Sequence, residues 1–259
     1  MLTATQLYNA ITRTGSNFAS TISGAPSVKQ QTNYFLDNIG KVTSATQLVQ
    51  NSRLYNYVMT AFGLNDELNA KALITKVLEG GTGSRSFAAS LVDPRYLALA
   101  EAFDFKTNGA ATTQSQTTQQ ATVSNYYEQM VENNAGQQNQ GAQMALYFKR
   151  MAPQISSVYS ILGDQTLLKV VETAYNLPST LSLEGIDTQA NEIGQLLNVS
   201  KLQDPTYLQK FIERFTASYD AQNPTGGNSS PPTVAMLVSQ PGISQNLLLS
   251  LANLKLGGS

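Results

Sequence analysis

Apolar side chains recur at intervals of three and four residues along most of this chain, which is the spacing of one face of an α-helix. Leu54, Val58 and Phe62 form one such stripe, and similar stripes occupy residues 96–103 and 207–215. No segment shows the period-two alternation of apolar and polar residues that is typical of a half-buried strand. The pattern therefore predicts an all-α protein.

The helical pattern occurs twice. Residues 34–64 align without a gap on residues 147–177, and about a quarter of the aligned positions are identical. The similarity resumes between residues 91–97 and 202–208, after a net shift of two residues. Most of the other aligned positions match in apolar or polar character, which is expected of two copies of one folded unit.

Residues at matching positions of the two copies also predict helix starts. Asp-Pro occurs at residues 93–94 and again at 204–205. The Asp side chain can accept hydrogen bonds from the free N–H groups of a first helical turn, and Pro at the first helical position has no N–H to satisfy. Asn51 and Asp164, which also align, are expected to cap the helices that follow them.

We therefore predict two tandem related helical units joined by a long helix-containing linker. From Thr107 to about Thr122 the chain is rich in Gln and Thr and has no core pattern, which indicates a linker that a long helix follows. Residues 223–232 are rich in Asn, Pro, Gly and Ser and cannot hold a helix. The predicted segments are a partly flexible N-terminal lead (1–26), the first helical unit (27–106), the linker and long helix (107–146), the second helical unit (147–220), and a second linker with a C-terminal amphipathic helix (221–259).

Charge and composition restrict the partners that this chain can have. The net charge is −1, so it offers no electrostatic attraction for nucleic acid or an anionic membrane. Charged residues make up 13% of the chain, about half the usual share of roughly 25%. Two interpretations of this low charge remain: an assembled or extracellular protein whose uncharged polar surface packs against copies of itself, or the ordinary composition of its lineage.

The chain has no Cys and no His. Their absence excludes disulfides, thiolate nucleophiles, Ser-His or Cys-His catalysis, and the usual zinc ligands. No apolar run approaches the roughly 18 residues that a membrane span needs. The first residues have no basic region followed by an apolar one, so we expect no cleaved secretory signal. Export by a machine that reads uncleaved N-termini stays open.

The remaining candidates for chemistry are carboxylates and one Gly-rich loop. Asp66 and Asp93 are expected to cap helices, and Glu101 and Asp104 to lie on solvated helix faces, which argues against a paired-carboxylate site. Residues 80–84, Gly-Gly-Thr-Gly-Ser, resemble a phosphate-binding loop, but no Lys follows the Gly and the loop follows a helix. A helix C-cap with a flexible turn is the favoured interpretation. We predict no catalytic residue, no cofactor and no metal site, and expect that the protein is not an enzyme.

The best candidate for partner binding is the C-terminal segment. Ile243, Leu247, Leu251 and Leu254 lie on one face of a predicted amphipathic helix. This face must be buried somewhere. It either folds back on the two units or docks in a groove of a partner or of a neighbouring subunit.

Short segments throughout the chain together form a recognisable signature. They are Tyr-Phe (34–35), Asn-Ile-Gly-Lys-Val-Thr-Ser (38–44), Arg-Leu (53–54), Ala-Phe-Gly-Leu (61–64), Asp-Pro-Arg-Tyr (93–96), Ala-Phe-Asp-Phe (102–105), Ala-Gly-Gln-Gln-Asn-Gln-Gly (135–141), Ala-Leu-Tyr-Phe (145–148), Ala-Pro (152–153), Thr-Ala-Tyr-Asn-Leu-Pro (173–178) and Arg-Phe-Thr (214–216). The chain thereby resembles the bacterial family of the domain of unknown function 1217 (DUF1217) over about residues 27–220.

This resemblance implies an all-helical protein of unestablished biochemical role, often encoded among flagellar genes, and it implies no catalytic residues. The leading hypothesis is a non-enzymatic structural or accessory protein of the bacterial flagellum, which contacts flagellar proteins or copies of itself. It would be exported by an uncleaved-signal route. The alternative is a cytoplasmic chaperone or regulator of flagellar assembly that binds partner segments between its two units. The weakest alternative is a carboxylate-based enzyme.

Overall fold

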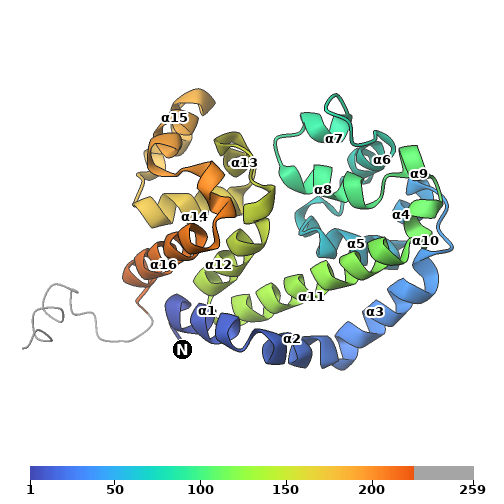
Figure 1. Cartoon of the computed structure of the whole chain (residues 1–259), viewed down its shortest axis with the longest axis horizontal. Helices are drawn as coiled ribbons and strands as arrows, with labels where there is room; N and C mark the ends of the chain where they lie inside the picture. The colour runs from blue at the N-terminus through green and yellow to red at the C-terminus, as the bar shows by residue number, and fades with distance from the viewer. Residues whose placement is uncertain (225–259) are drawn as a thin grey trace, which may run out of the picture.

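A computed structural model describes residues 1–224 of the chain. All regular secondary structure in these residues is helical, and no strand occurs among them, which confirms the all-α prediction. None of the helices in this part is both long and apolar enough to cross a membrane. The helices form two groups that lie side by side, with one long helix running beneath them (Figure 1).

The first group contains a hydrophobic core built around aromatic side chains. Tyr57 stacks between Phe35 and Tyr126, with ring centroids 4.5 Å and 3.9 Å apart, and each such pair adds roughly 0.5–1.5 kcal/mol to the burial of its area. The helices of this group are α3 (Pro26–Ile39), α4 (Ala45–Gln50), α5 (Ser52–Ala61), η1 (Asn65–Glu67), α6 (Lys71–Glu79), α7 (Phe87–Ser90), α8 (Pro94–Ala102), α9 (Phe105–Asn108) and α10 (Ala111–Gln114).

The second group has a separate core. Phe148 and Phe211 pack against each other there, with ring centroids 4.7 Å apart. The helices of this group are α12 (Gln140–Met151), η2 (Ala152–Gln154), α13 (Val158–Leu162), α14 (Gln165–Tyr175), η3 (Ser179–Leu183), α15 (Ile186–Leu196), η4 (Val199–Gln203) and α16 (Pro205–Gln222).

Helix starts fall at the spacing that the sequence alignment predicts. α4 and α13 begin at Ala45 and Val158, and α5 and α14 begin at Ser52 and Gln165, so each pair is separated by 113 residues. Side chains that align also act alike as caps. The six that accept hydrogen bonds from the first turns of their helices are Ser44, Asn51 and Asp93 in the first group and Ser157, Asp164 and Asp204 in the second.

The Gln/Thr-rich stretch is helical, which differs from the linker expected over residues 107–122. α11 (Gln116–Gln138) begins inside it, with Ser115 as the N-cap, and packs against α5 and α12. Thr113, buried just before it, donates its hydroxyl hydrogen bond to the carbonyl of Val42 at 2.6 Å. Thr side chains in this stretch therefore satisfy their polar groups on the backbone while their methyl groups pack. The predicted long helix is also divided, because Asn139 caps a new helix, α12.

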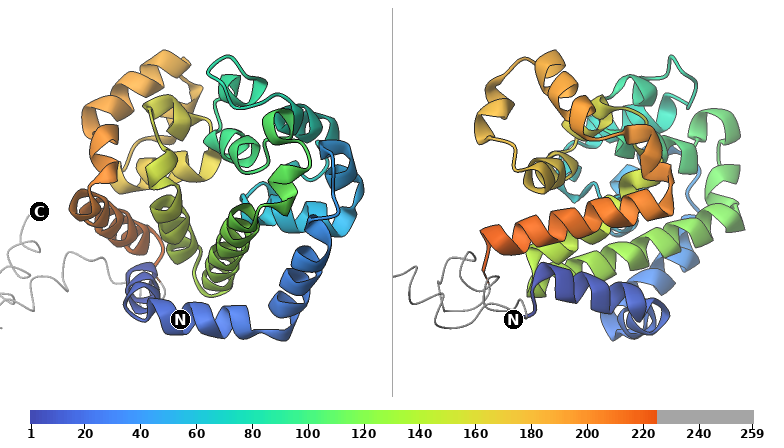
Figure 2. Two further views of the ribbon diagram at one scale, coloured as in Figure 1. Left: turned by 45° about the vertical axis from the view of Figure 1, so that its right-hand side comes forward. Right: turned by 60° about the vertical axis from the view of Figure 1, so that its left-hand side comes forward.

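The N-terminal residues are helical as well, although a partly flexible lead was expected there. α1 (Ala4–Arg13) starts with a capping box at Thr3 and buries Leu7 and Ile11 against α12. α2 (Gly15–Gly24) crosses beneath α11 and leads into α3 (Figure 2). The N-terminal segment is therefore divided between two helices, of which α1 packs on α12 and α2 packs on α11.

In the second group, α12 and α16 approach each other closely at a glycine. A Cβ atom added at Gly141 of α12 would overlap the ring of Tyr219 on α16. Gly141 therefore leaves room for the Tyr219 ring at the point where α12 and α16 touch.

Candidate functional site

Buried charges link the two helical groups around Arg95, on the first turn of α8. Its guanidinium donates to both carboxylate oxygens of Asp93, with Nε at 2.9 Å from Oδ2, and to the carbonyl oxygen of Gly63. It also pairs with Asp66 at 3.2 Å and lies 3.7 Å from Oδ2 of Asp164, which belongs to the second group. We call these residues, with Tyr147, the central polar cluster.

Asp164 serves both groups at once. Its Oδ1 accepts hydrogen bonds from the backbone N–H groups of Thr166 and Leu167, at 2.8 and 3.0 Å, and so caps α14. Its Oδ2 accepts a hydrogen bond from the hydroxyl of Tyr147 and faces Arg95. The side chain of Asp164 is 3% exposed, so its charge is stabilised almost entirely by these protein groups.

A second buried ion pair lies next to the cluster. Arg150 of α12 donates from Nε to Glu132 of α11 at 2.6 Å, and its Nη2 donates to Gln129 at 2.9 Å. The Arg150 guanidinium also stands 5.2 Å from the ring centroid of Tyr147, a cation–π distance. This pair fixes α11 against α12, so the long helix is joined to the second group by charge as well as by packing.

Burial and neighbouring charges shift the pKa values of these groups. Burial alone would lower the pKa of Arg95, but the hydrogen bond and charge of Asp93 outweigh it, so the pKa is raised above its ordinary value. Burial, reinforced by the charge of Asp164, raises the pKa of Tyr147, which therefore keeps its proton to donate. Burial also raises the pKa of Glu132, an effect that the hydrogen bonds from Arg150 partly offset.

The arrangement is suited to holding the two groups together. A Cβ atom at Gly163 would approach the backbone of Val92 and Asp93 to about 3 Å, so the turn before α14 lies directly against the turn before α8. In the described residues, no buried side-chain nitrogen or oxygen lacks a hydrogen-bond partner. The charges of the cluster are thus committed to one another, and breaking one buried pair typically costs 3–5 kcal/mol.

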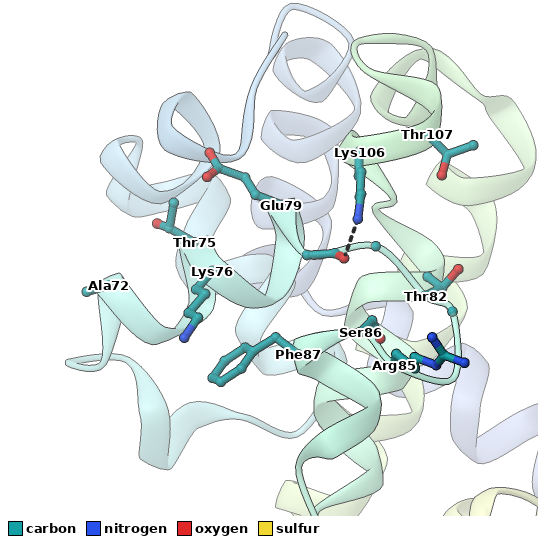
Figure 3. A pocket seen from close by; sticks show the side chains of 13 residues that line it. Ala72, Thr75, Lys76, Glu79, Thr82, Arg85, Ser86, Phe87, Lys106 and Thr107 are labelled. Atoms are coloured by element: carbon teal, nitrogen blue, oxygen red, sulfur yellow. Dashed lines mark hydrogen bonds between the residues drawn. The ribbon is translucent and has the colours of Figure 1, made fainter.

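The structure also contains a polar pocket of about 730 Å³ at the Gly-rich loop between α6 and α7. Its lining includes the basic side chains of Lys76, Arg85 and Lys106 and one carboxylate, Glu79 (Figure 3). Among residues 1–224, no group of three or more Asp and Glu side chains is placed to hold a metal ion.

A more apolar groove of about 620 Å³ lies between α1, α2, α11 and α12. Ile11, Tyr127, Val131 and Leu146 contribute to its lining, together with the exposed Lys149.

The structure tests several predicted roles. Asp93 caps α8 as expected. Asp66 does not cap a helix as expected but pairs with Arg95, because it lies inside the short η1, whose N-cap is Leu64. Asp104 is buried and caps α9 through the N–H of Thr107, so it is not a solvated face residue.

The predicted partner-binding face of Ile243, Leu247, Leu251 and Leu254 lies outside the described residues, so its role stays a prediction. The central polar cluster was not predicted. Its one sequence signal is that a charged Asp164 stands where the first copy has a neutral Asn51, since a buried charge needs a cation nearby.

The described residues form an all-helical protein in which the central polar cluster joins the two helical groups. The chain belongs to the family described as protein of unknown function DUF1217, whose sequence profile matches residues 61–208. It is similar to the crystal structure of protein AGR_C_984 from Agrobacterium tumefaciens, with 38% sequence identity and a TM-score of 0.77. That similarity covers 84% of this chain and 93% of the other. No curated protein matches the chain.

Proposed function

We propose that this protein is a non-enzymatic structural or accessory component of the bacterial flagellum, and that it acts through contacts with other proteins. The flagellar part of the proposal comes from the gene context that the family resemblance implies. The contact part is supported above all by an apolar edge on the second group, which is formed by Tyr159, Leu183 and Ile186.

These three side chains are 44%, 85% and 53% exposed, although large apolar side chains are usually covered. Tyr159 donates a hydrogen bond from its hydroxyl to Asp187 at 2.8 Å, which brings the start of α15 against α13. α15 packs mainly on α13 and projects from the rest of the second group (Figure 2). An apolar edge on a projecting helix is a typical protein-contact surface.

The organisation in two units is part of the same proposal. We infer that α3–α5 and α12–α14 are copies of one helical unit. The starts of α4 and α13 and those of α5 and α14 are each 113 residues apart, and the side-chain caps of these two pairs coincide. α8 and α16, each starting at Asp-Pro, complete the two copies. A protein built in this way offers two related surfaces, of which the second carries the apolar edge.

The C-terminal stripe of Ile243, Leu247, Leu251 and Leu254 is a second candidate contact. A chain truncated before Pro231 would show whether partners need it. Loss of partner binding with an unchanged melting temperature would support docking in a partner. Intact partner binding with a lower melting temperature would show that the stripe packs on its own chain.

Localisation tests the flagellar proposal directly. An epitope tag inserted at Gly24, where a side chain would meet no atom within 4 Å, leaves the first helix unaltered. Cytoplasm, sheared filaments with hook-basal bodies, and culture supernatant would be compared in wild-type cells and in a strain without flagellar export. Export-dependent appearance outside the cytoplasm is expected. Retention in the cytoplasm of both strains would contradict the proposal and favour an assembly chaperone or regulator.

The apolar edge can be tested in the same fractions. Leu183→Gln is expected to reduce association with the filament fraction several-fold, while Leu36→Gln, which changes an exposed Leu of the first group, should leave it unchanged. Leu183→Gln should keep the parent melting temperature, because its side chain is 85% exposed, and Leu36→Gln, at a position 42% exposed, should lower it only slightly. Equal association of the two variants would show that the edge is not a contact.

A further inference from the structure

The loop between α6 and α7 has the features of an anion site. Gly81 has a φ of +77°, which a residue with a side chain rarely adopts. The backbone N–H groups of residues 81–85 have no hydrogen-bond acceptor within the part of the chain that the structure describes. Consecutive free N–H groups in a Gly-rich turn are the usual donors to a bound oxyanion.

The structure supplies the lysine that the sequence motif lacks. Lys106, on α9, lies across the loop and donates to the carbonyl oxygen of Gly80 at 3.2 Å (Figure 3). A Cβ atom at Gly81 would lie only 2.8 Å from Cδ of Lys106 and 3.6 Å from its Nζ. The Gly therefore makes room for the lysine stem, and the ammonium group is held at the loop.

Two further cations line the same pocket. Arg85 is exposed on the loop and makes no ion pair or hydrogen bond with the rest of residues 1–224, so its guanidinium is available. The ammonium group of Lys76 stands 4.0 Å from the centroid of the Phe87 ring. It makes no ion pair with a carboxylate in residues 1–224. Glu79 is the one carboxylate in the lining. A protein of net charge −1 thus gathers three of its 16 cations around one loop.

We propose that this pocket binds a phosphate group, either as inorganic phosphate or as a small phosphomonoester. The ammonium of Lys106 and the guanidinium of Arg85 pair with the phosphate oxygens, and the N–H groups of the loop donate to them. A phosphate carries about −1.5 to −2 charges and three acceptor oxygens at neutral pH, which matches this set of cations and donors better than a single carboxylate does. The site is separate from the apolar edge and does not depend on the proposed contact function.

Isothermal titration of the full chain with inorganic phosphate tests the site, with sodium chloride holding the ionic strength constant. We expect saturable binding that Lys106→Met with Arg85→Gln weakens by about tenfold or more. The matched control is Lys29→Met with Arg13→Gln, which removes the same charge from exposed positions of α3 and α1 and should bind as the parent does. A phosphomonoester such as glycerol phosphate, titrated in parallel, distinguishes the two ligand forms.

Amide chemical shifts locate the bound anion independently of affinity. Phosphate should move the signals of residues 81–85 more than those of any other loop, and chloride at equal ionic strength should not. Binding without shifts at this loop would overturn the proposal. Equal weakening in both double variants would also overturn it, because the effect would then be one of net charge alone.

Discussion

Two helix caps at matching positions of the two groups differ by one charge. In the first group, Asn51 caps α5 and donates its side-chain amide hydrogen bond to the hydroxyl of Tyr34 at 3.5 Å. In the second, Asp164 caps α14 and accepts from the hydroxyl of Tyr147. The alignment pairs Asn51 with Asp164 and Tyr34 with Tyr147. The local geometry is therefore repeated, and the direction of the Tyr hydrogen bond is reversed.

The difference follows from what each cap faces. Asp164 faces Arg95 of the other group, and a neutral Asn there would leave that buried cation with less compensation. The Tyr34–Asn51 turn has its own cation, Arg53, whose guanidinium lies 3.9 Å above the Tyr34 ring and binds Gln31. The charged cap, Asp164, thus lies at the turn that faces the other group. The turn of Tyr34 and Asn51 keeps a neutral cap.

Left-handed residues show the same contrast. Gly63 and Asn176, 113 residues apart, both have positive φ, at 70° and 50°. A Cβ atom at Gly63 would lie 3.4 Å from Gln129 and 3.5 Å from Arg150, beside the buried ion pair. Asn176 is exposed and accepts a hydrogen bond from Gln222. The same backbone bend therefore lies beside the buried ion pair in the first group and faces solvent in the second.

The largest effect is expected from Asp164→Ala. This change removes the cap of α14, the acceptor of the Tyr147 hydroxyl and one partner of Arg95, so the free energy of unfolding should fall by about 3 kcal/mol. Urea denaturation followed by circular dichroism measures it. A loss no larger than that of Asn51→Ala would show that the charge adds nothing to the cap.

Gly141→Ala should have the next largest effect. The new methyl group meets the Tyr219 ring, so α12 and α16 must move apart, at a cost of about 2 kcal/mol. Gly24→Ala, with open space around it, is the control and should not destabilise. Thermal unfolding compares the two, and adding Tyr219→Ala to Gly141→Ala should recover part of the loss. If Tyr219→Ala recovered none of the lost stability, the strain would not arise from contact with this ring.

Asn51→Ala tests the neutral helix cap of the first group. It removes one capping hydrogen bond, to the N–H of Leu54, at a half-exposed position, so a loss of about 1 kcal/mol is expected from urea denaturation. Asn51→Asp keeps the cap and should change the stability by less than about 0.5 kcal/mol. A clear stabilisation by Asp would mean that the first group could also use a charged cap.

The smallest effect at neutral pH is expected from Tyr8→Phe. Its hydroxyl makes only a long hydrogen bond of 3.4 Å to Gln209, so the loss should be below about 0.5 kcal/mol. Burial, aided by the charge of Glu213, raises the pKa of Tyr8 to about 12. The folded chain therefore keeps this proton at pH values where the unfolded chain, with a pKa near 10, has lost it.

The contribution of Tyr8 to stability is thus complete below pH 10 and is lost as the pH rises from 10 to about 12. The alkaline fall in melting temperature should be shallower in Tyr8→Phe than in the parent. Tyr34→Phe, which alters a tyrosine of the first group, is the control. Identical alkaline curves for Tyr8→Phe and the parent would contradict the assignment.

The sequence predicted the local features of this fold well and the long-range ones poorly. The three- and four-residue spacing of apolar side chains predicted the helices. The expected helix caps are also present, at Asp93, Asp204, Asn51 and Asp164, because capping depends on residues within one turn. The contact of Arg95 with Asp164 joins residues 69 positions apart, and no local pattern encodes it. The lysine of the Gly-rich pocket was missed for the same reason, since Lys106 comes from a different helix.

The carboxylate of Asp220 on α16 accepts hydrogen bonds from the backbone N–H groups of Ala4 and Thr5, at 2.6 and 3.0 Å. It therefore holds the start of α1 from a position 216 residues later in the chain. At a synthesis rate of about 5–20 residues per second, α1 waits roughly 10–40 s on the ribosome before α16 exists. During that interval Tyr8, which packs in the core that α16 completes, lacks part of its partner surface, so α1 stays open to capture by a chaperone.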